Sequence, residues 1–352
     1  MLKRRFIKKA FWTCLAAILT SVVISCTAST PEVTLKVHHF LPTTSTSHQQ
    51  FIEPWAEAIA ADSGGRIKVE IYPTMQLGGK PPQLFDQVRD GVVDVAWTLP
   101  GYTPGRFPTV EVFELPFMAA SAEATSQAVQ EFYQRHLKEE FQDVHPLVFY
   151  VHAPGSFHMN GKPIQSLDDL KGVKVRAPTR VTNNVLQVLG ATPVGMPVPE
   201  VPEAVAKGVV DGTLLPYEVT RPLRVHELTD SHTEFGGDRG LYTAVFLFAM
   251  NKAKYESLPE TLKKVIDDHS GLALAQQAGQ VLDQAEAPGR QAAEDLGDTF
   301  YTIEEEELER WRVTAEPVID AWVAAMNAQG KDGEALLAEA RALVSKYADE
   351  SQ

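Results

Sequence analysis

Residues 86–103 read DQVRDGVVDVAWTLPGYT, and residues 203–220 read EAVAKGVVDGTLLPYEVT. Both stretches pass from a helix-like segment through a glycine, Gly91 or Gly208, into Val-Val-Asp and then to a proline near an aromatic residue. Each glycine fits the position just past a helix end, where a positive φ angle costs glycine little. Each copy therefore predicts a helix, a tight turn and a buried strand. We expect two lobes built alike, with the strand ends of both facing one cleft, where open α/β sheets bind ligands.

The segments that precede the first copy alternate between strand and helix patterns, which is typical of α/β proteins. Residues 33–40 (VTLKVHHF) and 66–73 (RIKVEIYP) predict strands, because apolar and polar side chains alternate along them. Residues 49–61 predict a helix, because large apolar residues recur on one face. These residues are Phe51, Ile52, Trp55 and Ile59.

Between the two copies, a short helix joins two strand-like segments; Ser166 caps this helix and Asp169 takes the capping-box position. After the second copy, residues 241–251 predict an apolar strand and residues 258–347 predict a helical C-terminal third. In that third, large apolar side chains recur at helical spacing: Leu308, Trp311, Val318 and Trp322. Pro317 interrupts this pattern and should kink the helix. We expect this segment to pack across the lobes and not to form a site.

Composition and charge limit the classes of function. The chain has 352 residues, of which 44% are hydrophobic and 22% charged, so it can build one large or two medium globular domains. Its formal charge is -14, and its acidic residues are spread along the chain. We therefore do not expect the protein to bind nucleic acid, because phosphate contacts need clustered Lys and Arg. An anionic ligand would need a local positive group inside a pocket.

The N-terminus has the layout of an export signal. It reads MLKRRFIKKAFWTCLAAILTSVVISC, with basic residues up to Lys9 and then an apolar run of about fifteen residues, shorter than the roughly twenty of a spanning helix. The run ends in VISC at Cys26, which resembles the lipobox of bacterial lipoproteins. That resemblance implies removal of residues 1–25, acylation of Cys26 and a lipid-anchored periplasmic protein; a plain signal peptide or an uncleaved anchor is the alternative. Since Cys14 lies within the signal, the mature chain would contain a single cysteine and no internal disulfide.

Six segments follow one another along the chain: GGRIKVEIYP, QLGGKPPQLFDQVRDGVVDVAW, TVEVFELPFMAA, SLDDLKGVKVRAPT, GVVDG and FLFAMNKAKYESLPETLKKVID. Taken in this order, they resemble one family, the DctP-type solute-binding proteins of TRAP transporters. The resemblance implies an α/β, two-lobed periplasmic-binding-protein clamshell with crossing strands and a long helix that spans the lobes. We expect lobe 1 mainly in residues 31–150 and lobe 2 mainly in 151–240. Residues 241–352 should supply a crossing strand and C-terminal helices that pack on both lobes.

The resemblance also implies a function. Such a receptor captures a small organic acid by lobe closure and delivers it to the membrane subunits of the transporter. Two other functions remain as alternatives: a ligand-sensing receptor for a membrane signalling partner, and an exported hydrolase. The hydrolase has little support, because the sequence contains no GxSxG elbow, HExxH, P-loop or GxGxxG after a strand. We expect no enzyme activity, no cofactor and no metal site, although a cation beside the ligand carboxylate stays open.

Arg176 is the expected partner of the ligand carboxylate, because the resemblance places an arginine at the end of the strand that follows a DLKG helix. The residues agree: Val173 and Val175 share one face of the strand, and Lys174 and Arg176 share the other. A guanidinium there can offer a planar fork to a carboxylate. The alternative is a surface arginine paired with a nearby acid.

The sequence departs from the common family pattern at two positions. Many relatives carry a second Arg where this chain reads GSFH at residues 155–158, and many carry an Asn where it has Leu215. With these two changes, we expect dicarboxylates and sialic acid to bind poorly. Because His, Tyr and apolar groups stand there instead, we expect a monocarboxylate with an oxo, hydroxyl or aromatic portion.

The remaining candidate ligand contacts each have a structural alternative. Trp97 and Tyr217 follow the repeated Val-Val-Asp elements and could stack on a ligand ring, or belong to the core. His39 follows a strand and could hydrogen-bond a ligand, and His158 lies where relatives hold their extra Arg. Phe117 lies in a family motif that more often supports packing.

Three further charged residues have an expected role. Arg106 is either a second cation at the cleft or a loop anchor. Asp94 and Asp211 end the two Val-Val-Asp elements, and we expect their carboxylates to bind backbone amides. They are not read as a catalytic pair.

Overall fold

The computed structural model describes residues 30–350, in which two mixed sheets form two lobes. The first sheet has the order β2-β1-β3-β10-β4, and the second has the order β11-β9-β5-β8-β6-β7. The strands of the first sheet are β1 (Val33–His38), β2 (Ile67–Tyr72), β3 (Val95–Thr98), β4 (Val144–Val151) and β10 (Val245–Asn251). Those of the second are β5 (Ser156–Met159), β6 (Lys174–Ala177), β7 (Thr192–Gly195), β8 (Gly212–Leu215), β9 (Ser231–Phe235) and β11 (Thr299–Ile303). The predicted two-lobed α/β fold is confirmed.

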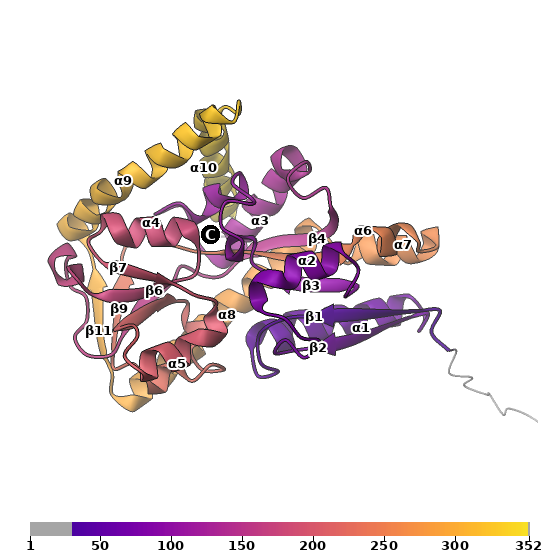
Figure 1. Cartoon of the computed structure of the whole chain (residues 1–352), viewed down its shortest axis with the longest axis horizontal. Helices are drawn as coiled ribbons and strands as arrows, with labels where there is room; N and C mark the ends of the chain where they lie inside the picture. The colour runs from indigo at the N-terminus through magenta and orange to yellow at the C-terminus, as the bar shows by residue number, and fades with distance from the viewer. Residues whose placement is uncertain (1–29, 351–352) are drawn as a thin grey trace, which may run out of the picture.

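Helices cover both sheets (Figure 1). The α-helices are α1 (Glu53–Asp62), α2 (Leu84–Arg89), α3 (Ala122–Phe132), α4 (Arg180–Val188), α5 (Val201–Ala206), α6 (Lys252–Glu256), α7 (Glu260–Asp268), α8 (Leu272–Leu296), α9 (Glu305–Ala328) and α10 (Gly333–Glu350). Shorter helical turns are η1 (Ser47–Ile52), η2 (Pro81–Gln83), η3 (Pro100–Tyr102), η4 (Val110–Glu114), η5 (Tyr133–Leu137), η6 (Leu167–Leu170), η7 (Val198–Glu200), η8 (Tyr217–Val219) and η9 (Val225–Glu227).

The two copies of the repeat occupy equivalent places. In each copy a short helix ends at a glycine with positive φ, 74° at Gly91 and 66° at Gly208. The strand that follows, β3 or β8, pairs in parallel with an earlier strand of its lobe, β1 or β6. Asp94 accepts a 2.8 Å hydrogen bond from the backbone N–H of Lys36, and Asp211 accepts one of the same length from Lys174. The expected role of both aspartates is therefore confirmed: each carboxylate binds a backbone N–H of a neighbouring parallel strand.

The chain crosses between the lobes several times. The segment from β4 to β5 leads from the first sheet to the second, and the segment from β9 to β10 leads back. Helix α8 also spans both lobes, since it packs against α3 in the first and η8 in the second. Two glycines permit this close approach: a Cβ on Gly279 would lie 2.5 Å from the Glu123 Cα, and one on Gly289 would lie 2.2 Å from the Tyr217 carbonyl oxygen.

The C-terminal third matches expectation in its helices but contains one strand that was not expected. The four predicted apolar residues of α9, namely Leu308, Trp311, Val318 and Trp322, are all buried. Helix α9 packs on α4 of the second lobe, and the Trp322 indole donates to the Pro108 carbonyl of the first at 2.8 Å. Pro317 lies inside this helix, which runs on past it to Ala328. The prediction of continuous helix was wrong at β11, because this short strand takes its hydrogen bonds from β9, far away in the sequence.

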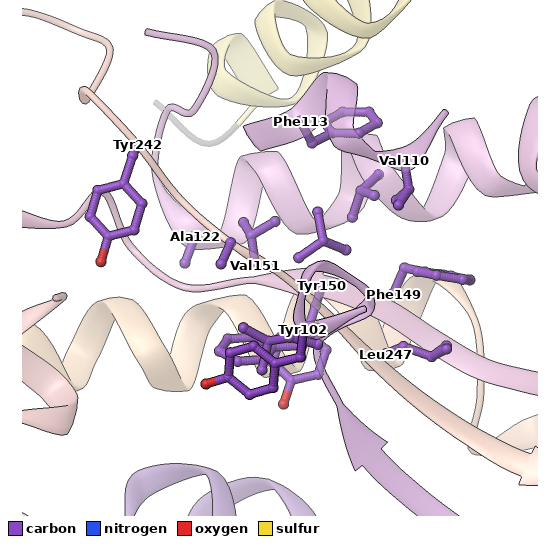
Figure 2. Packing of buried hydrophobic residues seen from close by; sticks show 14 of the residues in the cluster. Tyr102, Val110, Phe113, Ala122, Phe149, Tyr150, Val151, Tyr242 and Leu247 are labelled. Atoms are coloured by element: carbon purple, nitrogen blue, oxygen red, sulfur yellow. The ribbon is translucent and has the colours of Figure 1, made fainter. Parts of the chain in front are cut away.

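The buried apolar residues of both lobes form one core cluster, part of which Figure 2 shows, with Phe149 of β4 near Leu247 of β10. The predicted apolar face of residues 49–61 is buried as expected. In the segment before β6, the Asp169 carboxylate accepts a 2.9 Å hydrogen bond from the Ser166 N–H, as the capping-box prediction requires. Within residues 30–350, none of the helices combines the length and the apolar character that a membrane crossing needs.

Candidate functional site

A cavity lies between the two lobes and is walled mainly by apolar and aromatic side chains. Its total empty space, including its opening to solvent, is about 370 Å³. The first lobe contributes Phe40, Leu41, Trp97, Leu99, Tyr102, His152, Tyr242, Ala244 and Phe246, and the second contributes Arg176, Pro178, Val198, Leu215, Pro216, Glu218 and Val219. Because its walls are mainly apolar and aromatic, this cavity suits a small ligand with a flat, apolar body.

Arg176 supplies the cationic group of the cavity. It lies in β6, and its side chain is among the largest that are fully buried, with a relative exposure of 1%. Its Nε donates to the Met196 carbonyl at 3.0 Å and its Nη1 to the Leu214 carbonyl at 3.2 Å. Its Nη2 has no hydrogen-bond partner among residues 30–350. The two backbone bonds fix the guanidinium plane and leave one nitrogen for a ligand.

Among the described residues, no carboxylate forms an ion pair with the Arg176 guanidinium within 4 Å. Burial lowers the pKa of its guanidinium from the usual value near 12.5, and the phenols of Tyr102 and Tyr242 partly offset this shift. An arginine stays protonated under ordinary conditions, so the cavity holds an uncompensated positive charge. A buried charge of this kind favours an anionic ligand that can pair with it. The alternative of a surface arginine paired with an acid does not hold.

The aromatic wall is formed around Trp97. This residue lies in β3, is fully buried and stacks on Phe40 with ring centroids 4.7 Å apart. Phe246 of β10 lies 5.0 Å from Trp97 by the same measure. The structure therefore places Trp97 both in the core and in the cavity lining, where its ring can contact a ligand.

His152 lines the cavity as a neutral imidazole. Its Nδ1–H donates to the Ala153 carbonyl at 2.5 Å, and its Nε2 accepts from the backbone N–H of Ala244 at 3.0 Å. Burial, helped by the nearby Arg176 charge and opposed by the contact with the Ala153 carbonyl, lowers its pKa to about 4. His152 therefore shapes the wall without adding a second positive charge.

Glu218 is the acidic group of the cavity. It lies in η8 with a relative exposure of 5%, and its Oε2 has no hydrogen-bond partner among the described residues. Burial raises its pKa to about 8, and the neighbouring Glu286 carboxyl adds to this shift. Glu286 itself is held by the backbone N–H groups of Tyr217 and Glu218, at 3.1 and 2.9 Å. Glu218 is therefore largely protonated at neutral pH and does not cancel the charge of Arg176.

Direct contacts between the lobes close the cavity. The Tyr102 hydroxyl accepts a 3.0 Å hydrogen bond from the Val198 N–H. Outside the cavity, Arg180 of α4 forms a two-pronged ion pair with Glu111 of η4, in which Nε donates to Oε1 at 3.1 Å. These contacts join residues of different sheets, so they depend on how the lobes are oriented.

Three of the predicted contacts lie outside the cavity lining. The Tyr217 hydroxyl donates to Glu234 at 2.9 Å, and its ring packs edge-on against His158 at 4.8 Å. The Nε2 of His158 bonds the Leu215 carbonyl at 3.0 Å, and its Nδ1 faces His232 at 2.8 Å. The Nε2 of His39 bonds His48 at 2.9 Å, and its ring lies edge-on to Trp97. The polar atoms of all three side chains are already used within the protein, and none of the three residues lines the cavity.

Phe117 and Arg106 also lie away from the cavity. Phe117 is half-buried with a positive φ of 56°, and its ring packs against Phe235. Arg106 pairs with Asp86 at 2.8 Å and covers the Phe85 ring at 4.4 Å. Of the two alternatives for Arg106, the loop anchor is the one that the structure supports.

Sequence reasoning missed four polar or aromatic lining residues: Tyr102, His152, Glu218 and Tyr242. Two of them could have been found from the sequence, since Tyr102 and Glu218 follow the repeated Val-Val-Asp strands at their carboxyl ends.

Asn251, also in a family motif, donates to the Val88 and Arg89 carbonyls and so ends α2. Within residues 30–350, no three His, Cys, Asp or Glu side chains are grouped so that they could hold a metal ion.

Comparison with known proteins agrees with this geometry. Residues 37–325 match DctP, the bacterial extracellular solute-binding protein family 7. A TRAP solute-binding protein specific for aromatic acid ligands, from an unidentified marine metagenome microbe and in complex with metahydroxyphenylacetate, is 53% identical with a TM-score of 0.88; the match covers 90% of this chain and 99% of that one. A TRAP solute-binding protein from Rhodoferax ferrireducens T118, in complex with copurified benzoate, is 48% identical with a TM-score of 0.89, over 91% and 99% of the two chains.

A curated relative is similar over most of the chain. The outer membrane transporter protein TsaT of Comamonas testosteroni is 28% identical over 328 residues, which are 92% of this chain and 95% of TsaT. The family match, the two-lobed fold and the cationic cavity between the lobes lead to one assignment. The chain belongs to the DctP family of bacterial extracellular solute-binding proteins and is a receptor of the TRAP type.

Proposed function

We propose that this receptor captures an aromatic monocarboxylate and delivers it to the membrane subunits of a TRAP transporter. The observation that carries the proposal is the free Nη2 of Arg176, which is buried in a cavity walled by aromatic rings. The carboxylate of the ligand binds the guanidinium, and its ring lies among Trp97, Phe246 and Tyr242. The relatives at 53% and 48% identity, crystallised with aromatic acids, support this ligand class.

The cavity also argues against ligands with two carboxylates. Arg176 is its one arginine, no lysine lines it, and its histidine stays neutral. A second carboxylate would have to be buried without a cation, which costs several kcal/mol in real proteins. We therefore expect benzoate-like and arylacetate-like acids to bind, and C4-dicarboxylates and sialic acid to bind poorly.

Export and membrane attachment complete the proposal. The family is extracytoplasmic, in agreement with the signal-like N-terminus. We propose that Cys26, outside the described residues, carries the lipid that holds the receptor at the membrane surface.

The test is calorimetric titration of the purified mature chain with a panel of small acids, after a thermal-shift screen. The panel contains benzoate, hydroxybenzoates, phenylacetates, mandelate, succinate and sialic acid. Submicromolar to micromolar binding of at least one aromatic monocarboxylate, with no comparable binding of succinate or sialic acid, is the expected result. Preference for a dicarboxylate, or hydrolysis of a bound acid, would overturn the proposal.

A further inference from the structure

Glu218 occupies the boundary between two spaces. It lines the inner cavity together with Arg176, and it also lines an outer groove that includes Gln49, Arg221 and Gln284. Its side chain is nevertheless buried, and its Oε2 makes no hydrogen bond to any described residue. Its neighbours along the cavity wall, Leu215, Pro216 and Val219, offer no side-chain donor. Glu218 therefore lines the ligand space and has a carboxyl oxygen with unused hydrogen-bonding capacity.

An unpaired carboxyl of this kind is unfavourable in a purely apolar site. A buried donor or acceptor without a partner costs free energy, and natural sites remove that cost by pairing the group with another polar atom. No partner comes from Glu286, because its two oxygens accept from the backbone N–H groups of Tyr217 and Glu218. The phenols of Tyr150 and Tyr242 interact with its charge, but neither forms a hydrogen bond with Glu218 among the described residues. A ligand atom is the candidate that remains.

The chemistry of Glu218 selects the kind of ligand atom. Because its carboxyl is largely protonated at neutral pH, it can both donate and accept. A hydroxyl group matches both roles. A ligand ammonium would need an ionised Glu218, and burial beside Glu286 opposes that ionisation. Since Arg176 holds the ligand carboxylate in the proposed function, the group at Glu218 must be a second substituent.

We propose that Glu218 recognises a hydroxyl substituent on the ring of the bound acid, and that the preferred ligands are hydroxyaryl carboxylates. This inference rests on the proposed function and narrows it. Glu218 is thus a specificity-determining residue, and Arg176 is the residue that supplies general affinity for carboxylates. An unsubstituted aromatic acid would bind at Arg176 but would leave Glu218 without a partner.

The test compares matched ligands on matched variants by calorimetry. The ligands are benzoate, its three monohydroxylated isomers, phenylacetate, 3- and 4-hydroxyphenylacetate and phenylalanine. The variants are Glu218→Gln, which keeps both hydrogen-bonding roles, and Glu218→Leu, which removes them. The control is Glu114→Gln: Glu114 is also buried, has an unpaired Oε2 and has a pKa raised to about 8 by burial, but it does not line the cavity.

In the wild type, at least one hydroxylated acid should bind roughly tenfold or more tightly than its unsubstituted parent. Glu218→Gln should keep most of this ratio, Glu218→Leu should bring it close to one, and Glu114→Gln should leave it unchanged. Binding of benzoate itself should persist in Glu218→Leu, which shows that the variant is folded.

Two results would overturn the inference while leaving the proposed function in place: no hydroxylated isomer preferred over its parent, or the same preference in Glu218→Leu. Tighter binding of phenylalanine than of every hydroxy acid would also overturn it. Failure of all aromatic acids to bind would instead contradict the proposed function.

Discussion

The hydroxyl of Tyr102 in the first lobe accepts a 3.0 Å hydrogen bond from the backbone N–H of Val198 in the second. Both residues line the cavity, so the bond crosses the cleft beside the proposed ligand. Burial raises the pKa of the Tyr102 phenol above its usual value of 10, which keeps it neutral. The bond requires the present orientation of the lobes, and it therefore stabilises the closed form over any form in which they separate.

Replacing Tyr102 with Phe should weaken binding of an aromatic acid about threefold to tenfold, since a neutral hydrogen bond contributes roughly 0.5–1.5 kcal/mol. The loss should be mainly in the dissociation rate, measured by stopped-flow fluorescence. Tyr72→Phe is the control, because its hydroxyl bonds Glu70 within the first lobe. Equal effects of the two substitutions would contradict a role in closure.

Arg176→Ala should lower affinity at least tenfold and up to a hundredfold or more, because a charge-assisted contact is worth roughly 1.5–3 kcal/mol and the ligand carboxylate loses its partner. Arg176→Lys should recover part of this loss, since an ammonium cannot offer the planar fork. Arg106→Ala should bind like the wild type, because Arg106 pairs with Asp86 away from the cavity. Calorimetry with a melting curve for each variant is the measurement. Unchanged affinity in a folded Arg176→Ala protein would refute the assignment.

Ligand binding should compact the molecule in solution scattering, since the cavity is formed by both lobes. Scattering curves that are identical with and without saturating ligand would exclude a hinge mechanism.

Arg180→Met should reduce ligand affinity about twofold to fivefold at low salt and less at high salt. The reason is that the partly exposed Arg180–Glu111 pair joins the lobes and is screened by ions. Arg224→Met removes an exposed pair with Glu227 inside the second lobe and should leave ligand affinity unchanged.

Stability should fall as pH rises from about 6.5 to 9. Burial raises the pKa values of Glu114 and Glu218 to about 8 and that of Glu286 to about 7, from a usual 4.5. Above pH 4.5 the folded form therefore still holds protons that the unfolded chain has lost, and this proton binding stabilises the folded form. The stabilisation is lost as the pH rises through the pKa values of the folded form. Melting temperatures of ligand-free protein across this range provide the measurement.

The control for this pH dependence is a pair of substitutions, Glu114→Gln and Glu218→Gln, which should flatten the curve. Between pH 4.5 and 6.5 the curve should flatten, because burial lowers the pKa of His152 to about 4 and those of His39 and His158 to about 3. In this range the unfolded chain holds extra protons on these histidines while the folded form holds extra protons on the carboxyls, so the two effects oppose each other. A melting temperature that stays constant between pH 6.5 and 9 in the wild type would contradict the buried, neutral state of these carboxyls.

The mature protein should begin at an acylated Cys26. Intact-mass analysis of protein extracted from the native membrane should give a mass that lacks residues 1–25 and includes lipid. Two acyl chains suffice for stable anchoring, so the protein should fractionate with membranes. Cys26→Ser should release it or block processing, and Cys14→Ser should have no effect. Cleavage at another position without lipid would remove this prediction.

The sequence by itself determined the features that depend on local patterns. The repeat of GVVD predicted two equivalent helix–turn–strand units, because a glycine after a helix and a buried strand are recognisable in any context. Arg176 was predicted at a strand end by alternation, together with a family resemblance. The same patterns predicted that Asp94 and Asp211 bind backbone amides. Both do so, at the N–H groups of Lys36 and Lys174, and the same bond therefore occurs in both lobes.

Only the tertiary structure decided which side chains meet in the cavity. In η8 the successive residues Tyr217 and Glu218 point to different surroundings, so the aromatic residue packs on His158 and the acid faces the ligand space. No periodicity predicts this, because a single turn of 3₁₀ helix after a strand sets the direction of each side chain. For the same reason His158, the expected ligand contact, lies inside the second sheet, whereas His152 lies at the cleft where β4 leaves the first sheet. Burial and the contacts between lobes, which join residues far apart in the sequence, made the site.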